Sequence, residues 1–490
     1  MKKKYLILLV LVAFFSACTD KFEEFNLDIK NPAITPGENL FSRAQHQLVR
    51  QISSTNVNLN IFKLMSQYWT ECTYIDEANY DIINRSIPDN TFRQYYVGND
   101  ADNSGGFLKD FKEAASIIEA TAVSGSAAEK VKANKLAIIE LLTVYSFHNL
   151  VDIFGDLPYS EALNIDNIAP KYDPAATIYQ DLITRIDAAL ADLDDSEGSF
   201  GAADFIYGGD VALWKKFANS LKLKIGINLA DANPALAKTT VESAVSGGVF
   251  TSSDDNAYFP FMSATHTNPM YEDIIQSGRN DFVPANTIVD IMNTLSDPRR
   301  PFYFTLYQGA YLGGRYGYES PYSNYSHIPD AISAPDFHGI LLTYDEVLFY
   351  MAEAAARGFT VGSTEEALYD DAITASIVSW GGTTADATTF LAQPAVAYAT
   401  AAGTYKQKIG TQAWVAFYTR GIEGYTEWRR MDYPIFGIGS LISTYDEIPV
   451  RFSYPVNEQT LNKANYTSAA TAIGGDKIST KLFWDKFGKP

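Results

Sequence analysis

One segment, residues 301–325, is rich in both tyrosine and glycine, and its side chains could hold a ligand without reacting with it. Residues 301–325 contain nine aromatic residues and four glycines, whereas aromatic residues make up 13% of the whole chain. Glycine lets the backbone bend, so the window presents flat rings rather than a helix core. Such a ring can stack on the apolar face of a sugar while its hydroxyl makes a hydrogen bond. The candidate ligand contacts in this window are Tyr307, Tyr311, Tyr316, Tyr318 and Tyr322.

A sugar also needs polar partners for its hydroxyl groups. The candidates that precede the window are Asn268, Arg279 and Asp281. A second aromatic group lies early in the chain, among polar residues such as Asp76 and Asn79, and consists of Trp69, Tyr74 and Tyr80. Two interpretations remain open for these rings. Most are expected to be buried in an irregular lobe, and a few to line a platform for sugar rings or apolar ligand faces.

Residue patterns that mark common catalytic centres are missing from the sequence. It contains no H-E-x-x-H, C-x-x-C, G-x-x-x-x-G-K-[ST], G-x-S-x-G or G-x-G-x-x-G motif. No two of the five histidines lie three or four residues apart, so a helical metal pair is not expected. A glycosidase needs only two carboxylates that meet in space, and sequence cannot place them. The missing motifs favour a non-enzymatic protein without metal or cofactor. A secreted glycoside hydrolase stays open as the alternative, because it needs no linear motif.

One stretch imitates the start of a calcium loop. The segment from Asp100 to Gly105 fits the first six positions of that loop, but the twelfth position is Phe111, where a bidentate glutamate is required. A solvated turn is the better interpretation.

The N-terminus has the features of an export and anchoring signal. Three lysines precede an apolar stretch of eleven residues, 5–15, which is too short to span a membrane. The sequence Phe15-Ser16-Ala17-Cys18 resembles a lipobox, in which the cysteine is acylated. We expect a signal peptide over 1–17, lipidation at Cys18 and a tether over 18–39. The acidic residues after Cys18 resemble a surface-export signal, and ordinary secretion with a solvated tether is the alternative.

Charge and cysteine content narrow the possible partners. The formal net charge is −20, and a strongly acidic chain repels phosphate backbones, so we expect no nucleic-acid partner. Cys72 is the only cysteine besides Cys18, and we expect it to be buried as a small apolar residue.

Helical patterns dominate the rest of the chain. Ile138, Leu141, Leu142 and Tyr145 form a core-facing stripe, and Asp210 is placed to cap a helix that runs to about residue 232. Two predicted capping boxes, Thr343 with Glu346 and Ser363 with Glu366, open an antiparallel helix hairpin of tetratricopeptide-like length, whose helices stop at Gly358 and at Gly381-Gly382. The predicted fold class is mainly α, with a helical scaffold over about 40–232 and 341–432, a loop-rich aromatic lobe over about 233–340 and an irregular segment over 433–490.

Several segments together resemble the SusD/RagB family of nutrient-binding outer-membrane lipoproteins. Besides the lipobox, the resemblance rests on Phe154-Gly155-Asp156-Leu157-Pro158, Trp214-Lys215-Lys216-Phe217, Asp297-Pro298-Arg299-Arg300, Ala352-Glu353-Ala354, Glu427-Trp428-Arg429-Arg430 and Ile448-Pro449-Val450-Arg451-Phe452. These segments span nearly the whole chain. Most of them are framework motifs, which indicate fold and class and leave the ligand open.

The resemblance implies a scaffold of about four tetratricopeptide-like helix pairs, with a loop-rich lobe that carries short strands. It also implies a SusC-like TonB-dependent barrel transporter as partner, a lipid anchor in the outer membrane facing the cell exterior, and no catalytic activity. The implied function is to bind an extracellular nutrient, for which we expect an oligosaccharide, and to deliver it to the barrel. A peptide ligand is the alternative within the family.

Overall fold

The structure is a computed structural model that describes residues 35–82, 85–99, 104–437 and 448–486. The predicted signal peptide, Cys18 and most of the predicted tether lie outside the described residues, as do residues 100–103 of the calcium-like segment.

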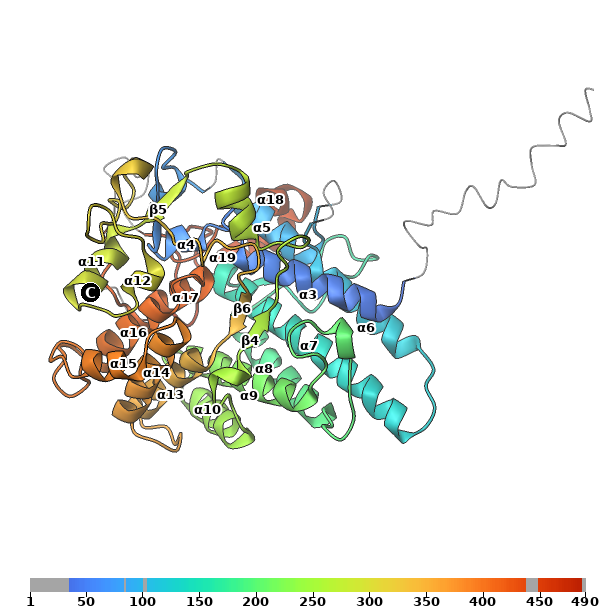
Figure 1. Ribbon diagram of the computed structural model, residues 1–490. Helices are drawn as coiled ribbons and strands as arrows, with labels where there is room; N and C mark the ends of the chain where they lie inside the picture. Colours follow the sequence, from blue (N-terminus) through green and yellow to red (C-terminus); the bar gives the residue numbers. More distant parts are fainter. Residues whose placement is uncertain (1–34, 83–84, 100–103, 438–447, 487–490) are drawn as a thin grey trace, which may run out of the picture.

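Antiparallel helix pairs form the scaffold, which confirms the prediction of a mainly α fold with tetratricopeptide-like pairs. In the N-terminal part of the described chain, helices α3 (Gly37–Ser53) and α6 (Phe107–Ala120) pack against each other. In Figure 1 the helices run from α6 and α7 through α8, α9 and α10 to α13–α16, while the short elements gather on one side of this row. The four sequential pairs are α7 (Ser126–Phe154) with α8 (Ala175–Asp192), α9 (Val211–Asn228) with α10 (Pro234–Gly247), α13 (Tyr344–Ala356) with α14 (Glu365–Ser379), and α16 (Tyr405–Ala416) with α17 (Gly421–Met431).

The apolar stripe predicted on α7 lies in the core. Ile138, Leu141, Leu142 and Tyr145 have no exposed surface. Among the described residues α7 is the one helix long and apolar enough to span a bilayer, but 83% of its apolar stretch is buried inside the protein, as in the core helix of a globular fold.

Short strands and helices make up the loop-rich lobe and the connections around the scaffold. Three two-stranded antiparallel sheets pair β1 (Trp69–Glu71) with β5 (Phe282–Pro284), β2 (Leu157–Pro158) with β3 (Tyr172–Asp173), and β4 (Ala257–Phe259) with β6 (Gly339–Leu342). The shorter helices are α4 (Phe62–Met65), α5 (Ile87–Tyr96), α11 (Asn286–Thr294), α12 (Arg300–Tyr303), α15 (Thr384–Leu391), α18 (Val456–Leu461) and α19 (Lys463–Ala472).

The segment boundaries differ from the predicted ones at two places. Helix α10 lies inside the range predicted for the lobe, because Asn233 caps it and Pro234 occupies its first turn, where proline is tolerated. The C-terminal segment, expected to be irregular, contains α18 and α19. The lobe also draws in β1 from the early part of the chain, through its pairing with β5.

Helix caps agree with the sequence in some places and differ in others. The carboxylate of Asp210 accepts hydrogen bonds from the backbone of Ala212 and Leu213 and caps α9 as predicted. The box predicted at Thr343 and Glu346 is wrong, since Thr343 makes no side-chain cap bond and both residues interact with Arg420 instead. The cap of α14 is Thr364 rather than Ser363. Gly358 and Gly381 end their helices with positive φ, as predicted.

Buried charged side chains link elements of the lobe and of the scaffold. Arg299, fully buried beside α12, pairs with Asp297 at 2.6 Å and donates hydrogen bonds to Ser376 on α14 and Gln412 on α16. Arg430 on α17 pairs with Glu353 on α13 at 2.6 Å. Three of the framework motifs therefore supply charges that hold elements together across the interior.

Candidate functional site

Three distant segments meet at one surface, which we call the platform: residues 72–74, 279–281 and 315–322. The β1–β5 ladder aligns the first two, and it continues where the backbone N–H of Cys72 donates to the carbonyl of Asp281 at 2.8 Å. The carbonyl of Cys72 accepts from the backbone of Ser320 at 3.1 Å. Cys72 itself is buried, as predicted, and burial raises the pKa of its thiol to about 12.

The platform presents several side chains that are at least partly exposed, and neighbouring side chains hold most of these in place. Tyr74 is 66% exposed. The guanidinium carbon of Arg315 lies 3.6 Å from the ring centroid of Tyr318, and Arg279 forms an ion pair with Asp281 at 2.7 Å. The ring of Tyr322 stacks on His327 with centroids 3.8 Å apart and planes within 11°. Two tyrosines thus have one face fixed by a cation or an imidazole, while both remain partly exposed.

Four other predicted contacts lie in the interior. Trp69, Tyr80, Tyr316 and Asn268 are at most 3% exposed. The indole of Trp69 donates to Tyr418, and the hydroxyl of Tyr316 donates to the carbonyl of Leu64. The amide of Asn268 donates to the carbonyl of Phe337 and accepts from the backbone of Met270. These four side chains are buried by protein in this structure, and of the four only Tyr316 borders a hollow, the one beside Arg315.

Tyr307 and Tyr311 belong to a separate hairpin. Tyr307 pairs with Ala310 across a turn at Gly309, which has positive φ. The carbonyl of Tyr311 accepts a hydrogen bond from Asn293 on α11. Both rings are half-buried, and neither residue takes part in the backbone bonds that assemble the platform.

Two buried glutamates lie beneath the platform. Burial, together with the neighbouring Glu77, raises the pKa of Glu71 well above its ordinary value. Glu71 accepts a hydrogen bond from the backbone of Ala78, and Glu77 pairs with Arg85 at 2.7 Å. Burial of Glu71 next to a second carboxyl group therefore favours the neutral form of Glu71 more than solvent does.

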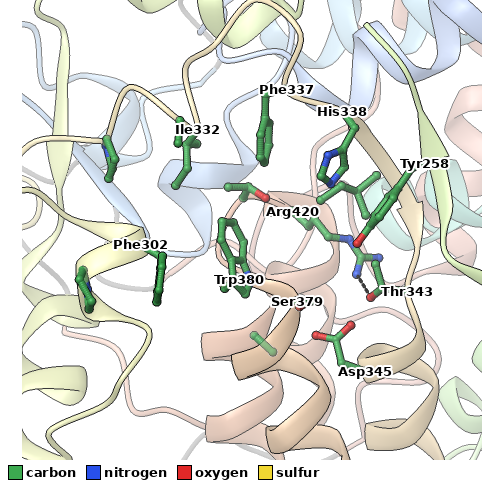
Figure 2. Close-up of a pocket in the computed structure, with 16 residues that line it drawn as sticks. Tyr258, Phe302, Ile332, Phe337, His338, Thr343, Asp345, Ser379, Trp380 and Arg420 are labelled. Carbon is green, nitrogen blue, oxygen red and sulfur yellow. Dashed lines mark hydrogen bonds between the residues drawn. The ribbon is translucent and has the colours of Figure 1, made fainter. Parts of the chain in front are cut away.

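Two hollows border the lobe. One, of about 340 Å³, opens beside Arg315, between it and the polar side chains of Asn286 and Asp290. The other, of about 350 Å³, lies between the lobe and the scaffold. Figure 2 shows Phe302, Phe337 and Trp380 on one side of this second cavity, and Thr343, Asp345 and Arg420 on the other.

The described residues contain no group of three histidine, cysteine, aspartate or glutamate side chains that could hold a metal ion. The geometry offers stacking surfaces and hydrogen-bonding groups.

Comparison with known proteins identifies the family. A family model described as starch-binding and associating with the outer membrane, the SusD-like family, matches residues 29–455. The chain belongs to the SusD-like family. The resemblance seen in the sequence is thereby confirmed, and a search of curated protein sequences found no match.

Solved structures of SusD homologues share the fold. One similar structure is a chitin-binding protein, with a TM-score of 0.79 and 25% identity over 92% of this chain and 100% of the other. Another is a chitin-binding SusD homologue from Flavobacterium johnsoniae, with a TM-score of 0.72 and 25% identity over 92% and 98% of the two chains. A SusD homologue from Bacteroides uniformis has a TM-score of 0.76 and 25% identity over 91% and 99%.

Sequence reasoning missed some residues that the structure brings to these places. Arg315 stands between two glycines and Tyr316, and its charge next to a tyrosine run was the available signal. Trp380 directly precedes the predicted helix stop at Gly381-Gly382, and that position at a helix end was the available signal. No local signal marked Phe337, because its cavity forms from segments far apart in the chain.

Proposed function

We propose that this SusD-like protein binds extracellular oligosaccharide at the platform without cleaving it. The observation that carries the proposal is a set of three tyrosines on a hydrogen-bonded frame, gathered from two distant segments: Tyr74, which is exposed, and Tyr318 and Tyr322, which are partly exposed. Tyrosine rings held by stacking partners need little further ordering when a ligand arrives, so less of the binding free energy is lost.

Polar groups around the rings suit the edges of a sugar. At least about a third of each side chain is exposed in Arg279, Asp281 and Arg315. These side chains supply donors and acceptors for hydroxyl groups. The hollow beside Arg315 adds Asn286 and Asp290 within the same region. A glycan is favoured over a peptide because two of the similar solved proteins are chitin-binding.

The delivery role completes the proposal. We infer a lipid anchor at Cys18, an outer-membrane location facing the cell exterior and a SusC-like TonB-dependent barrel that accepts the glycan. A shallow, exposed site binds weakly, and tethering it at the pore raises the effective concentration of ligand there. The second candidate function is a peptide-binding member of the same family, which the mixed charges of Arg279, Asp281 and Arg315 would also suit. A glycoside hydrolase remains the alternative from another class.

Affinity electrophoresis through gels that contain soluble starch or glycol chitin tests the platform. The expected result is retardation of the wild-type protein by at least one glycan, and its loss in the Tyr74→Ala/Tyr318→Ala variant. Tyr466→Ala is the control, since Tyr466 is half-buried on α19 beside Asp476 and Tyr454. Equal retardation of the double variant and the wild type would contradict the platform. Retention by immobilised peptides alone would favour the peptide-binding candidate.

A further inference from the structure

The cavity between the lobe and the scaffold has a wall of aromatic rings. The planes of Phe337 and Trp380 lie within 27° of each other, with centroids 6.5 Å apart. Trp380 packs edge-on against the buried ring of Tyr303 at 4.7 Å, and Phe302 lies against Gly381, where a β-carbon would come within 2.9 Å of the Phe302 ring. The positions of Phe302 and Trp380 are therefore fixed by packing behind the cavity, although both rings remain partly exposed.

Polar groups face this wall from the opposite side (Figure 2). Arg420 donates to the hydroxyl of Thr343 at 3.1 Å and pairs with Glu346, which also pairs with Lys224 at 3.0 Å. The carboxylate of Asp345 is buried at the cavity. The neutral imidazole of His338 lies between the rings of Tyr258, 4.0 Å away, and Phe337, 4.8 Å away, and can both donate and accept.

Two buried polar atoms at the cavity lack a hydrogen-bond partner among the described residues. They are the hydroxyl oxygen of Thr419 and the Nε of Arg420, on side chains that are each 6% exposed. A buried donor or acceptor without a partner has lost the hydrogen bonds that it makes with water in the unfolded chain, so a ligand or water that satisfies one is favoured. An entirely apolar ligand would leave both atoms unsatisfied.

The charges around the cavity restrict the ligand further. The cations Arg420 and Lys224 are matched by the anions Glu346 and Glu423, and Asp345 has no cation within ion-pair distance among the described residues. No positive charge is left over to bind an anionic ligand. The volume of about 350 Å³ lies at the small end of the range of about 300–1,000 Å³ that small-molecule pockets occupy.

We propose that this cavity is a second saccharide site, distinct from the platform, that takes one or two sugar rings of a neutral glycan. The apolar face of a ring stacks on Phe302 and Trp380, and hydroxyl groups reach Asp345, His338 and Thr419. The inference rests on the proposed glycan-binding function, but its residues are separate from those of the platform.

Tryptophan fluorescence gives a direct readout. Of the six tryptophans, Trp380 alone is more than 2% exposed; the other five are Trp69, Trp214, Trp414, Trp428 and Trp484. Quenching by acrylamide therefore reports mainly on the cavity. The probes are maltose, cellobiose and N,N′-diacetylchitobiose at millimolar concentration, with glucuronic acid as the anionic comparison and cyclohexanol, which does not fluoresce, as a mainly apolar one.

We expect at least one neutral disaccharide to lower the quenching constant of the full chain at least twofold, with no effect of glucuronic acid. Asp345→Asn, which is nearly isosteric, and Phe302→Leu should each weaken this protection at least fivefold, while Tyr318→Ala on the platform should leave it unchanged. Trp380→Phe should remove the signal, which confirms its source, and circular dichroism checks that each variant is folded.

Three results would overturn the second site. They are no protection by any of the three disaccharides, equal protection by glucuronic acid, and protection by cyclohexanol alone. Protection lost in Tyr318→Ala rather than in Asp345→Asn would also overturn it and would assign the binding to the platform. Glycan retardation in the gel that persists while Trp380 stays unprotected would contradict the cavity and leave the proposed function standing.

Discussion

Removal of the Asp297 carboxylate tests how the lobe is held on the scaffold. Arg299 has no exposed surface, and its Nη2 lies 2.6 Å from Oδ2 of Asp297, while Nε lies 2.9 Å from Oδ1. Asp297→Ala would leave a guanidinium buried with only the neutral partners Ser376 and Gln412. Breaking a buried pair by removing one partner costs about 3–5 kcal/mol, because the remaining charge is uncompensated. We expect the free energy of unfolding to fall by about this amount.

The chain contains a matched control for this experiment. Arg279 and Asp281 are also two residues apart and form an ion pair of nearly the same length, 2.7 Å, but their side chains are 60% and 35% exposed. Asp281→Ala should cost less than about 1 kcal/mol, because solvent screens an exposed pair and can solvate the arginine left behind. The two variants differ mainly in burial.

Urea unfolding followed by circular dichroism measures both effects, since the midpoint shifts with stability when the slope is unchanged. A double variant, Asp297→Ala with Arg299→Met, should recover part of the loss, because it buries no uncompensated charge. A cost below about 1 kcal/mol for Asp297→Ala, equal to that of Asp281→Ala, would refute the view that this buried pair anchors the lobe.

Three further predictions follow from the platform, a buried histidine and a buried glutamate. Tyr318→Ala should weaken glycan binding by about 1 kcal/mol, or roughly fivefold, because one stacking ring is lost. Titration calorimetry measures this affinity. An unchanged affinity would exclude Tyr318 as a ligand contact. Burial and the nearby charge of Arg50 lower the pKa of His46 to about 4, so the folded state keeps this imidazole neutral. The stability that the neutral imidazole of His46 allows is present above pH 6.5 and is lost as the pH falls towards 4, by about 1–2 kcal/mol after screening. His46→Gln should therefore flatten the acid side of the plot of unfolding free energy against pH. An unaltered plot would contradict the lowered pKa of His46. Burial and the neighbouring Glu77 raise the pKa of Glu71, so the wild type loses stability as the pH rises above about 4.5. Glu71→Gln should therefore be more stable than the wild type at pH 8, and lower stability there would contradict the raised pKa of Glu71.

Local patterns predicted most of the scaffold. Helix periodicity, the Asp210 cap and the glycine stops at Gly358 and Gly381 depend on residues within a turn or two, so the sequence alone could place them. The failed box at Thr343 and Glu346 depends on Arg420, which lies more than 70 residues away and recruits both side chains into a buried ion-pair network. No local pattern reports such a competitor.

The platform was predicted in part. Tyr74 is exposed and Tyr318 is partly exposed, as a ligand contact must be, but Tyr316, two residues before Tyr318, is buried and donates to the carbonyl of Leu64. In a glycine-rich loop no regular period assigns alternate residues to opposite faces, so sequence could not separate these two tyrosines. The sequence could not predict Trp380 as a cavity residue for a different reason, because its cavity exists only once the lobe packs on α13 and α14.

The most direct test of the central claim combines binding with product analysis in one sample. The full-length protein is titrated calorimetrically with the glycan that retards it most strongly in the gel, and the glycan is then recovered and sized by chromatography. Our account predicts a saturable heat of binding, its loss in the Tyr74→Ala/Tyr318→Ala variant, and recovered chains of unchanged length. Shortened chains from the wild type, or binding that survives intact in the double variant, would contradict non-catalytic capture at the platform.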